Sequence, residues 1–393
     1  MHHTGISRRD YLRTLAATSL GTLLAPRVFA ATPPSARIED LRTISWKPPL
    51  YHGWATLARK KNGELLLAFS GGREAHICPF GRLELMRSRD NGQSWGWPQV
   101  IADCLIDDRD AGVLETPQGS LLLTNFTSLA YADLLSAAEK LAPGQPKSWE
   151  PLKLAEWRAA HNRLTEQERR SELGTWMWRS TDGGVTWSAR YPVPCNSPHG
   201  PIGLKDGRLL YLGVSLWAQD RIVGVWESTD DGLTWKLLCR LPVRPGDDPV
   251  QYHELHAVET GQGTLIGHIR NHNPANKGET LQTESTDGGR TWSTPHPVGV
   301  WGLPSHLLRL KDNRLLMTYG YRRPPFGNQS RVSSDNGQSW SEPLTISADG
   351  LNGDLGYPST VECDDGMLVT VWYEVLKGAE FAQLRQARWR LTN

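Results

Sequence analysis

Six times along the chain, an apolar run, a short polar turn and a second apolar run follow one another. The turns between the paired runs are Asn62-Gly63, Gln118-Gly119, Asp206-Gly207, Gln262-Gly263, Asp312-Asn313 and Asp365-Gly366. Dipeptides of this kind between β-rich runs are strong signals for β-hairpins. The pattern therefore predicts six hairpins in one chain.

A second repeated element follows five of these hairpins. It is the string Ser-x-Asp-x-Gly-x-Thr/Ser-Trp, and its copies begin at Ser88, Ser180, Ser228, Ser285 and Ser333. We interpret each copy as a tight turn between strands. The Asp accepts bonds from exposed backbone N–H groups, the Gly takes a conformation closed to other residues, and the Trp packs as a plug. The repeated aspartates are therefore expected to be structural rather than catalytic: Asp90, Asp182, Asp230, Asp287 and Asp335.

The spacing of the repeats predicts a propeller. The later copies follow one another at intervals that suit one four-stranded blade each, whereas the interval from Asp90 to Asp182 is much wider. The extra length contains 134–170, which is rich in Ala, Leu, Glu and Arg and has apolar residues at helical spacing. We expect an all-β, six-bladed β-propeller with five such turns and a helical insertion at about 131–173, between the second and third strands of blade two.

The two ends of the chain are expected to close the ring. Blade six has room for only about three strands after Tyr357, and a propeller must complete its last blade. The stretch from Ile38 to Trp46 should supply the missing outer strand. Residues 31–393 are thus predicted to form a single domain.

Composition narrows the function without changing the fold. The chain has 43 Lys and Arg against 42 Asp and Glu, so a nucleic-acid partner held by net charge is not expected. The repeats account for five of the 17 Trp, which outnumber the 6 Phe. The 5 Cys are widely spaced and form no CxxC pair, which indicates neither a disulfide framework nor a structural zinc site. No metal or other cofactor is predicted.

The first thirty residues carry the pattern of an export signal. A twin-arginine pair, Arg8-Arg9, precedes a mildly apolar run from Leu15 to Leu24 and a small-residue cleavage pattern that ends at Ala31. We predict that 1–30 is a twin-arginine signal peptide read by the Tat export machinery. The apolar run is too short for a permanent anchor, so the mature protein is expected to be periplasmic or secreted, with no membrane anchor.

Polar side chains at the start of the inner strands are the first site candidates, because those strands converge on one rim of a propeller. Counting back nine residues from the second residue of each hairpin turn marks the start of the inner strand. In blades two, four and six this count gives Asp110, Glu254 and Tyr357. Near the same point, the other three blades carry histidines: His52, His199 and His306. The loop after the second strand adds a second ring of candidates: Arg73, Glu74 and His76 in blade one, Arg270 in blade four, and Arg322 and Arg323 in blade five.

These repeats and residues resemble the sialidase (neuraminidase) superfamily of BNR or Asp-box propellers over 40–393. The resemblance implies a tyrosine nucleophile activated by a glutamate, an aspartate as acid/base and three arginines that bind a substrate carboxylate. Tyr357 lies in a segment similar to that of the family's nucleophile, and Glu254 followed by Arg270 resembles the glutamate and one of the arginines. A phenol, with an ordinary pKa near 10, needs such a carboxylate to take its proton.

The chain also departs from the family pattern. His52 stands where the first carboxylate-binding arginine is expected, although the segment from Phe69 to Arg73 matches. The acid/base aspartate has no clean counterpart, which leaves Glu74, His76 or Asp110 as the proton donor. The third arginine falls at Arg322 or Arg323.

The resemblance implies a retaining exo-glycosidase that hydrolyses a terminal sugar from a glycan. An acidic sugar is expected, and a sialic or related 2-keto acid, a uronic acid and a neutral sugar stay open as substrates. Tyr357 would attack, Glu254 would activate it, and Arg270, Arg73 and one of the Arg322/Arg323 pair would hold the substrate. Two alternatives stay open. In a polysaccharide lyase, His199 or His306 would abstract the C5 proton of a uronate. A non-catalytic carbohydrate-binding propeller would have no need of the Tyr357/Glu254 pair. Metal binding by His52, His199 and His306 is not favoured, because they are not at short ligand spacing.

Overall fold

Each predicted hairpin joins the first and second strands of one antiparallel sheet. The computed structural model describes Met1, residues 33–45 and residues 47–392. Blade one contains β2 (Tyr51–Arg59), β3 (Leu65–Arg73), β4 (Arg82–Ser88) and β5 (Gln99–Ala102). Blade two contains β6 (Asp107–Glu115), β7 (Leu121–Ser128), β8 (Thr175–Ser180) and β9 (Tyr191–Pro192). Blade three contains β10 (Ile202–Gly203), β11 (Leu209–Val214), β12 (Val223–Ser228) and β13 (Lys236–Arg240).

The remaining blades repeat this order. Blade four contains β14 (Tyr252–Glu259), which follows a 3-10 turn at Pro249–Gln251, then β15 (Leu265–Asn271), β16 (Thr280–Ser285) and β17 (His296–Pro297). Blade five contains β18 (Ser305–Arg309), β19 (Leu315–Tyr321), β20 (Gly327–Ser333) and β21 (Leu344–Ser347). Blade six contains β22 (Gly350–Glu362), β23 (Leu368–Leu376), β24 (Gln383–Thr392) and β1 (Ser35–Ser45). The predicted six-bladed, all-β propeller is confirmed.

The hydrophobic core lies between neighbouring blades. The second strands are buried on both faces, and all six residues of β11 are buried. One core cluster joins Leu66 and Leu85 of blade one to Val113 and Leu123 of blade two. Full burial of such a side chain contributes about 1.5–3 kcal/mol. The position of each inner strand is therefore set by both of its neighbours.

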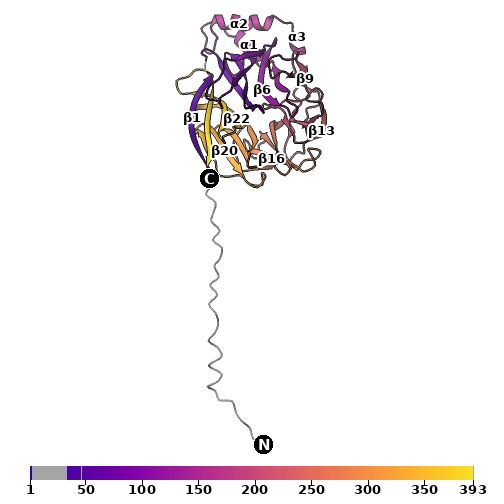
Figure 1. The fold of residues 1–393 in the computed structure, drawn as a ribbon. Helices are drawn as coiled ribbons and strands as arrows, with labels where there is room; N and C mark the ends of the chain where they lie inside the picture. The colour runs from indigo at the N-terminus through magenta and orange to yellow at the C-terminus, as the bar shows by residue number, and fades with distance from the viewer. Residues whose placement is uncertain (2–32, 46, 393) are drawn as a thin grey trace. The chain divides into compact units, whose positions relative to one another are not determined.

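The two ends of the chain close the ring, as predicted. Strand β1 pairs antiparallel with β24, from Ser35 opposite Thr392 to Ser45 opposite Leu384. Figure 1 shows the indigo β1 beside the yellow strands of the C-terminus. All six blades belong to one unit, Pro34–Thr392. Trp46, the last residue of the predicted closing strand, and residues 2–30 of the predicted signal peptide lie outside the described residues.

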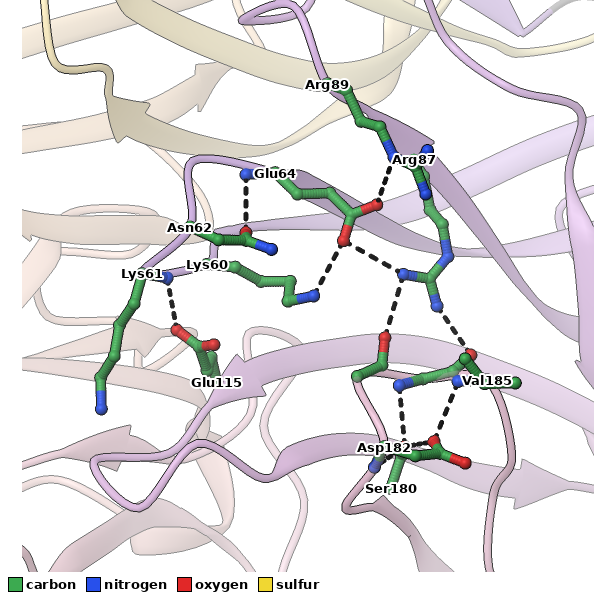
Figure 2. A network of polar contacts seen from close by, with 12 residues as sticks. Lys60, Lys61, Asn62, Glu64, Arg87, Arg89, Glu115, Ser180, Asp182 and Val185 are labelled. Carbon is green, nitrogen blue, oxygen red and sulfur yellow. Dashed lines mark hydrogen bonds and ion pairs between the residues drawn. The ribbon is translucent and has the colours of Figure 1, made fainter.

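The repeated turns lie between the third and fourth strands and hold each blade to the previous one. In blade two, Asp182 Oδ1 accepts hydrogen bonds from the backbone N–H groups of Val185 and Thr186, both at 3.0 Å. Arg87, from blade one, donates to the carbonyls of Gly183 and Gly184 in the same turn, at 3.2 and 2.7 Å. Figure 2 shows Arg87 reaching toward the turn that contains Asp182 and Val185. The aspartate thus shapes the turn from within while the neighbouring blade binds its outer side.

Two of the repeated tryptophans also bridge blades. Trp95 Nε1 donates to Gln386 Oε1 of blade six at 2.7 Å, and Trp340 Nε1 donates to Gln282 Oε1 of blade four at 3.0 Å. These bonds support the interpretation of the repeats as structural plugs.

Three helices form the predicted insertion between β7 and β8: α1 (Ala130–Glu139), α2 (Pro151–Asn162) and α3 (Glu166–Ser171). In α3, Thr165 and Glu168 form a capping box. Tyr131 and Trp157 pack against Cys78, which lies in the loop after β3. Figure 1 shows the helices gathered at the top of the propeller. Across the described residues, no helix is long and apolar enough to cross a membrane.

The turns give a direct test of their structural role. Asp230 in blade three accepts hydrogen bonds from Thr234 N at 2.9 Å and Thr234 Oγ1 at 2.5 Å. Asp230→Ala should lower the free energy of unfolding by about 1 kcal/mol, the usual cost of losing a side-chain cap. Urea denaturation followed by fluorescence measures this change.

The control is Asp220→Ala. Asp220 forms an exposed ion pair with Arg240, at 2.5 Å, and such pairs contribute at most about 1 kcal/mol and often nothing measurable. If the two variants have the same unfolding midpoint as the wild type, the turn aspartates do not stabilise the blades.

Candidate functional site

Four inner strands are interrupted by a β-bulge at the same end of the propeller. The pairing register shifts in β2, β6, β14 and β22 at 53–56, 109–112, 252–255 and 356–359. Within these bulges stand Trp54, Asp110, Glu254 and Tyr357. The φ angles of Trp54, Asp110 and Tyr357 are 52°, 57° and 52°. These values lie in the left-handed region, where a non-glycine residue is strained by on the order of 1–3 kcal/mol. A bulge re-aims a side chain, and all four side chains turn into one pocket.

This pocket has a volume of about 230 Å³ and is lined by residues from all six blades. The structure brings six of the twelve predicted site residues together here: His76, Asp110, Glu254, Arg270, Arg322 and Tyr357.

Tyr357, Glu254 and Arg270 form a hydrogen-bonded triad. Tyr357 Oη donates to Glu254 Oε1 at 2.5 Å. Arg270 Nη1 donates to the other carboxylate oxygen at 2.5 Å and to Tyr357 Oη at 3.2 Å. Arg270 itself is held by His272, whose Nε2 accepts from Arg270 Nε at 2.9 Å. The phenol oxygen therefore touches both a proton acceptor and a cation.

The electrostatics of the triad keep the phenol neutral and the carboxylate charged. Burial and the charge of Glu254 raise the pKa of Tyr357 well above its ordinary value. Burial alone would raise the pKa of Glu254, but the charge of Arg270 and the hydrogen bonds from Tyr357 and Arg270 outweigh it, so that pKa is lowered. Glu254 is thus a carboxylate poised to accept the phenol proton.

Asp110 has the opposite electrostatic environment. Burial, followed by the nearby charge of Glu254, raises the pKa of Asp110 to about 7. Asn196 Nδ2 donates to its Oδ2 at 3.1 Å. Two carboxyl groups in one pocket thus have pKa values that are pushed apart, an arrangement typical of acid–base sites.

The structure distinguishes between the two candidate arginines of blade five. Arg322 lines the pocket, donates from Nε to the Leu355 carbonyl at 2.9 Å, and has its guanidinium carbon 5.9 Å from the centre of the Tyr357 ring. The guanidinium of Arg323 lies instead over Trp301, at 5.5 Å. Arg322 is therefore the residue positioned to meet a ligand.

Arg73 and Glu74 do not line the pocket. The Arg73 side chain is completely buried and donates to both carboxylate oxygens of Asp107, at 2.6 and 3.0 Å. Its remaining donors bind backbone carbonyls and Ser70. Glu74 Oε2 accepts a hydrogen bond from Trp157 Nε1 of α2 at 2.9 Å. Because these groups are already engaged by the protein, the expectation that Arg73 binds substrate or that Glu74 donates a proton has no support in the geometry.

The three predicted histidines of the inner strands also lie elsewhere. His52 is buried, has its Nδ1 2.6 Å from Ser45 Oγ, and faces a separate cavity between blades one and six. His199 and His306 are buried together with His256, with ring centres 4.6–5.2 Å apart. Burial lowers the pKa of both His199 and His306 well below the ordinary value. They lack access to a ligand in the pocket.

Several pocket residues were missed in the sequence: Arg109, Asn196, Arg221 and His253. Trp54, which also lines the pocket, stands nine residues before Gly63, the count that gives Asp110, Glu254 and Tyr357 in other blades. Arg109 and His253 are direct neighbours of predicted residues. No local signal distinguishes Asn196 or Arg221 from ordinary loop residues.

Among the described residues, no group of three or more His, Cys, Asp or Glu side chains is arranged to hold a metal ion. The chemistry available in the pocket comes from a neutral phenol, a carboxylate, a second carboxyl group, an imidazole and guanidinium groups.

Residues 148–370, more than half of the chain, match the family model described as BNR repeat-like domain. No curated protein matches the chain. A protein of unknown function from Dyadobacter fermentans is similar in structure, with a TM-score of 0.73 and 22% identity, over 91% of this chain and 100% of that one. The intramolecular trans-sialidase from Ruminococcus gnavus, in complex with oseltamivir carboxylate, has a TM-score of 0.58 and 14% identity, over 87% and 94%. Trypanosoma rangeli sialidase, in complex with the inhibitor DANA, has a TM-score of 0.56 and 15% identity, over 90% and 59%. At these identities the likeness establishes the shared six-bladed fold.

The environment of Asp110 predicts how stability depends on pH. Below about pH 4 this side chain is protonated in both the folded and the unfolded chain. Above that, the unfolded chain ionises while the folded chain keeps the proton up to about pH 7, so the wild type loses stability over this interval. Asp110→Asn should remove that loss, and its stability relative to the wild type should rise by at most about 1.4 kcal/mol per pH unit. Urea denaturation at both ends of the interval measures the difference.

Asp103→Asn is the matched control, because it makes the same substitution at an exposed position outside the pocket. A constant difference between Asp110→Asn and the wild type across the interval would contradict the assigned environment of Asp110.

Proposed function

Since the chain belongs to the BNR repeat-like domain family and is a divergent member of the sialidase superfamily, we propose that it is a retaining exo-glycosidase that hydrolyses a terminal acidic sugar from glycans. The observation that carries this proposal is the hydrogen bond of 2.5 Å between Tyr357 Oη and Glu254 Oε1. It couples a nucleophile to its base inside a pocket large enough for one sugar ring.

In the first step, Tyr357 Oη attacks the anomeric carbon and passes its proton to Glu254. The bond to the leaving oxygen breaks, and an acid in the pocket protonates that oxygen. Water then attacks the anomeric carbon of the glycosyl–tyrosine and gives a proton to the conjugate base of that acid. The phenol oxygen leaves and takes back its proton from Glu254. Arg270, at 3.2 Å from Tyr357 Oη, stabilises the negative charge that develops on the phenol oxygen in both steps. Two displacements at one carbon retain its configuration.

The charges of the pocket favour an anionic sugar. Four arginines line it, Arg109, Arg221, Arg270 and Arg322, against two carboxyl groups. The guanidinium of Arg109 lies over the Trp54 ring, with its central carbon 4.7 Å from the ring centre. A neutral phenol also avoids placing a charged nucleophile beside an anionic substrate. A carboxylate on the sugar would meet guanidinium donors suited to it.

The two alternatives have weaker support. The lyase hypothesis assigned proton abstraction to His199 or His306, and both are buried among other histidines away from the pocket. A binding propeller without catalysis gives no reason for a phenol donating to a carboxylate that a guanidinium also holds.

The expected location of the reaction, the periplasm or the outside of the cell, follows from the predicted signal peptide.

Tyr357→Phe tests the proposal. The variant keeps the ring but lacks the nucleophile, so turnover should fall at least about 10³-fold. The assay uses 4-methylumbelliferyl glycosides of N-acetylneuraminic acid and of glucuronic acid with the protein from Ala31 to Asn393, and ultraviolet absorbance is followed for an unsaturated uronate. The expected result is release of the fluorophore without new absorbance.

Tyr319→Phe is the matched control, because Tyr319 is a buried tyrosine of blade five that donates to Gln329 Oε1 at 3.0 Å, outside the pocket. This variant should keep wild-type turnover. Wild-type activity in Tyr357→Phe, or an unsaturated product, would overturn the glycosidase.

A further inference from the structure

His76 and Asp354 form a hydrogen-bonded pair at the edge of the pocket. His76 lies in the loop between β3 and β4, lines the pocket and has a side chain that is 44% exposed. Its Nδ1 lies 2.8 Å from Asp354 Oδ1. Asp354 belongs to β22, three residues before Tyr357. The strand that carries the nucleophile thus also carries the carboxylate that holds this imidazole.

Asp354 is built to stay ionised. Tyr51 Oη donates to its two oxygens at 3.0 and 3.1 Å, and Tyr373 Oη lies 3.2 Å from Oδ1. Burial alone would raise the pKa of Asp354, but the hydrogen bond and charge of His76 and the bonds from the two tyrosines lower it. A carboxylate in this state accepts the Nδ1 proton of the imidazole. That bond fixes the orientation of the ring.

The other ring nitrogen is then free for chemistry. No hydrogen-bond partner of His76 Nε2 is found in the part of the chain that the structure describes, while Nδ1 is held by Asp354 and Tyr51. The ring packs edge-on against Trp54, with centres 4.9 Å apart. The pair therefore presents one defined nitrogen at the mouth of the pocket.

The loop that carries His76 is held in place by two residues that do not line the pocket. Arg73 Nη2 donates to the His76 carbonyl at 3.1 Å, and Arg73 Nε donates to the Ala75 carbonyl at 3.3 Å. Glu74 is bound by Trp157 of α2 at 2.9 Å. The helical insertion and the buried Arg73–Asp107 pair thus fix the backbone of His76 from both sides.

We propose that His76 is the acid–base group of the reaction and that Asp354 is its positioning residue, an inference that rests on the proposed glycosidase function. The imidazolium gives its Nε2 proton to the leaving glycosidic oxygen as the C–O bond breaks and Tyr357 Oη bonds to the anomeric carbon. The neutral imidazole then takes a proton from the attacking water, which restores the imidazolium. The sum of both steps is glycoside plus water giving free sugar plus alcohol.

Exposure decides between His76 and Asp110. An exo-acting enzyme encloses the terminal sugar while the rest of the glycan leaves through the mouth, so the proton donor must reach an oxygen near the rim. His76 is nearly half exposed, whereas Asp110 is only 6% exposed. Asp110 also interacts with Glu254, the base for the nucleophile. Its position suits a neutral hydrogen-bond donor to the enclosed sugar.

Several charged or titratable groups surround the pair. On the elements packed against it are Tyr51, Arg73, Asp354 and Tyr373, and across the pocket are Arg109, Asp110, Glu254, Arg270 and Arg322. Of these, only Asp354 and Tyr51 bond the imidazole directly, both at Nδ1. Asp354→Asn should therefore loosen the orientation of the ring while leaving the other groups of the pocket in place.

The test compares leaving groups. A 4-methylumbelliferyl group leaves without being protonated, whereas the lactose released from the lactosyl glycoside of N-acetylneuraminic acid must be protonated as it leaves. If the wild type prefers glucuronides, an aryl and an alkyl glucuronide replace these two substrates. In His76→Ala, kcat on the lactosyl glycoside should fall about 10²–10⁴-fold and kcat on the aryl glycoside by at most about tenfold. Asp354→Asn should show the same selectivity with a smaller loss, and Asp354→Glu should recover part of the activity.

His296→Ala is the matched control, since His296 pairs with Glu284 at 2.7 Å on the outer edge of blade four, and its activity should equal that of the wild type. Unfolding midpoints show whether each variant is folded. Equal losses on both substrates, no loss, or a selective loss in Asp110→Asn instead would overturn the role of His76. A wild type inactive on every glycoside would instead contradict the glycosidase function itself, and the pair would lose its proposed role with it.

Discussion

The charge of Glu254 governs the architecture of the pocket. A largely buried carboxylate is stable only when hydrogen bonds and a countercharge replace water, and Arg270 and Tyr357 supply both at 2.5 Å. Glu254 and Arg270 come from blade four and Tyr357 from blade six, so the interaction exists only if the ring of blades is closed. The pairing of β1 with β24 completes blade six. Ring closure and the hydrogen bond of the nucleophile are thus mechanically linked.

The repeated turns and the bulges play complementary parts in this arrangement. At one end of the propeller, the turn aspartates shape their own turns, and turn carbonyls and tryptophans bond the neighbouring blades. At the other end, inner strands depart from regular pairing, and Trp54, Asp110 and Tyr357 take left-handed backbone conformations. That backbone strain is tolerated because each inner strand is packed on both sides. One end of the fold therefore provides rigidity and the other presents reactive side chains.

Much of the fold was predictable because its signals are local and repeated. The turn dipeptides predict the hairpins, and the string from Asp to Trp predicts the turn between the third and fourth strands of a blade. The closing strand was predicted by counting the strands left for blade six. Within the pocket, Tyr357, Glu254 and Asp110 were found because a fixed distance from a turn marks the start of an inner strand. The arginines and histidines were harder. Arg73 and His199 stand near the positions in their own blades that Arg270 and Glu254 hold in blade four. Their partners, Asp107 and the neighbouring histidines, come from other blades. Asp354 was missed because its role exists only through His76, in a different blade.

In the proposed reaction, Tyr357 becomes covalently bonded to the sugar. The most direct measurement is to incubate the protein with a fluorinated derivative of the proposed anionic sugar substrate, which slows the second step more than the first, and to locate the adduct by mass spectrometry. We expect one sugar per chain, attached to the peptide that contains Tyr357. Turnover of the parent glycoside with no adduct, or with an adduct on another residue, would contradict it.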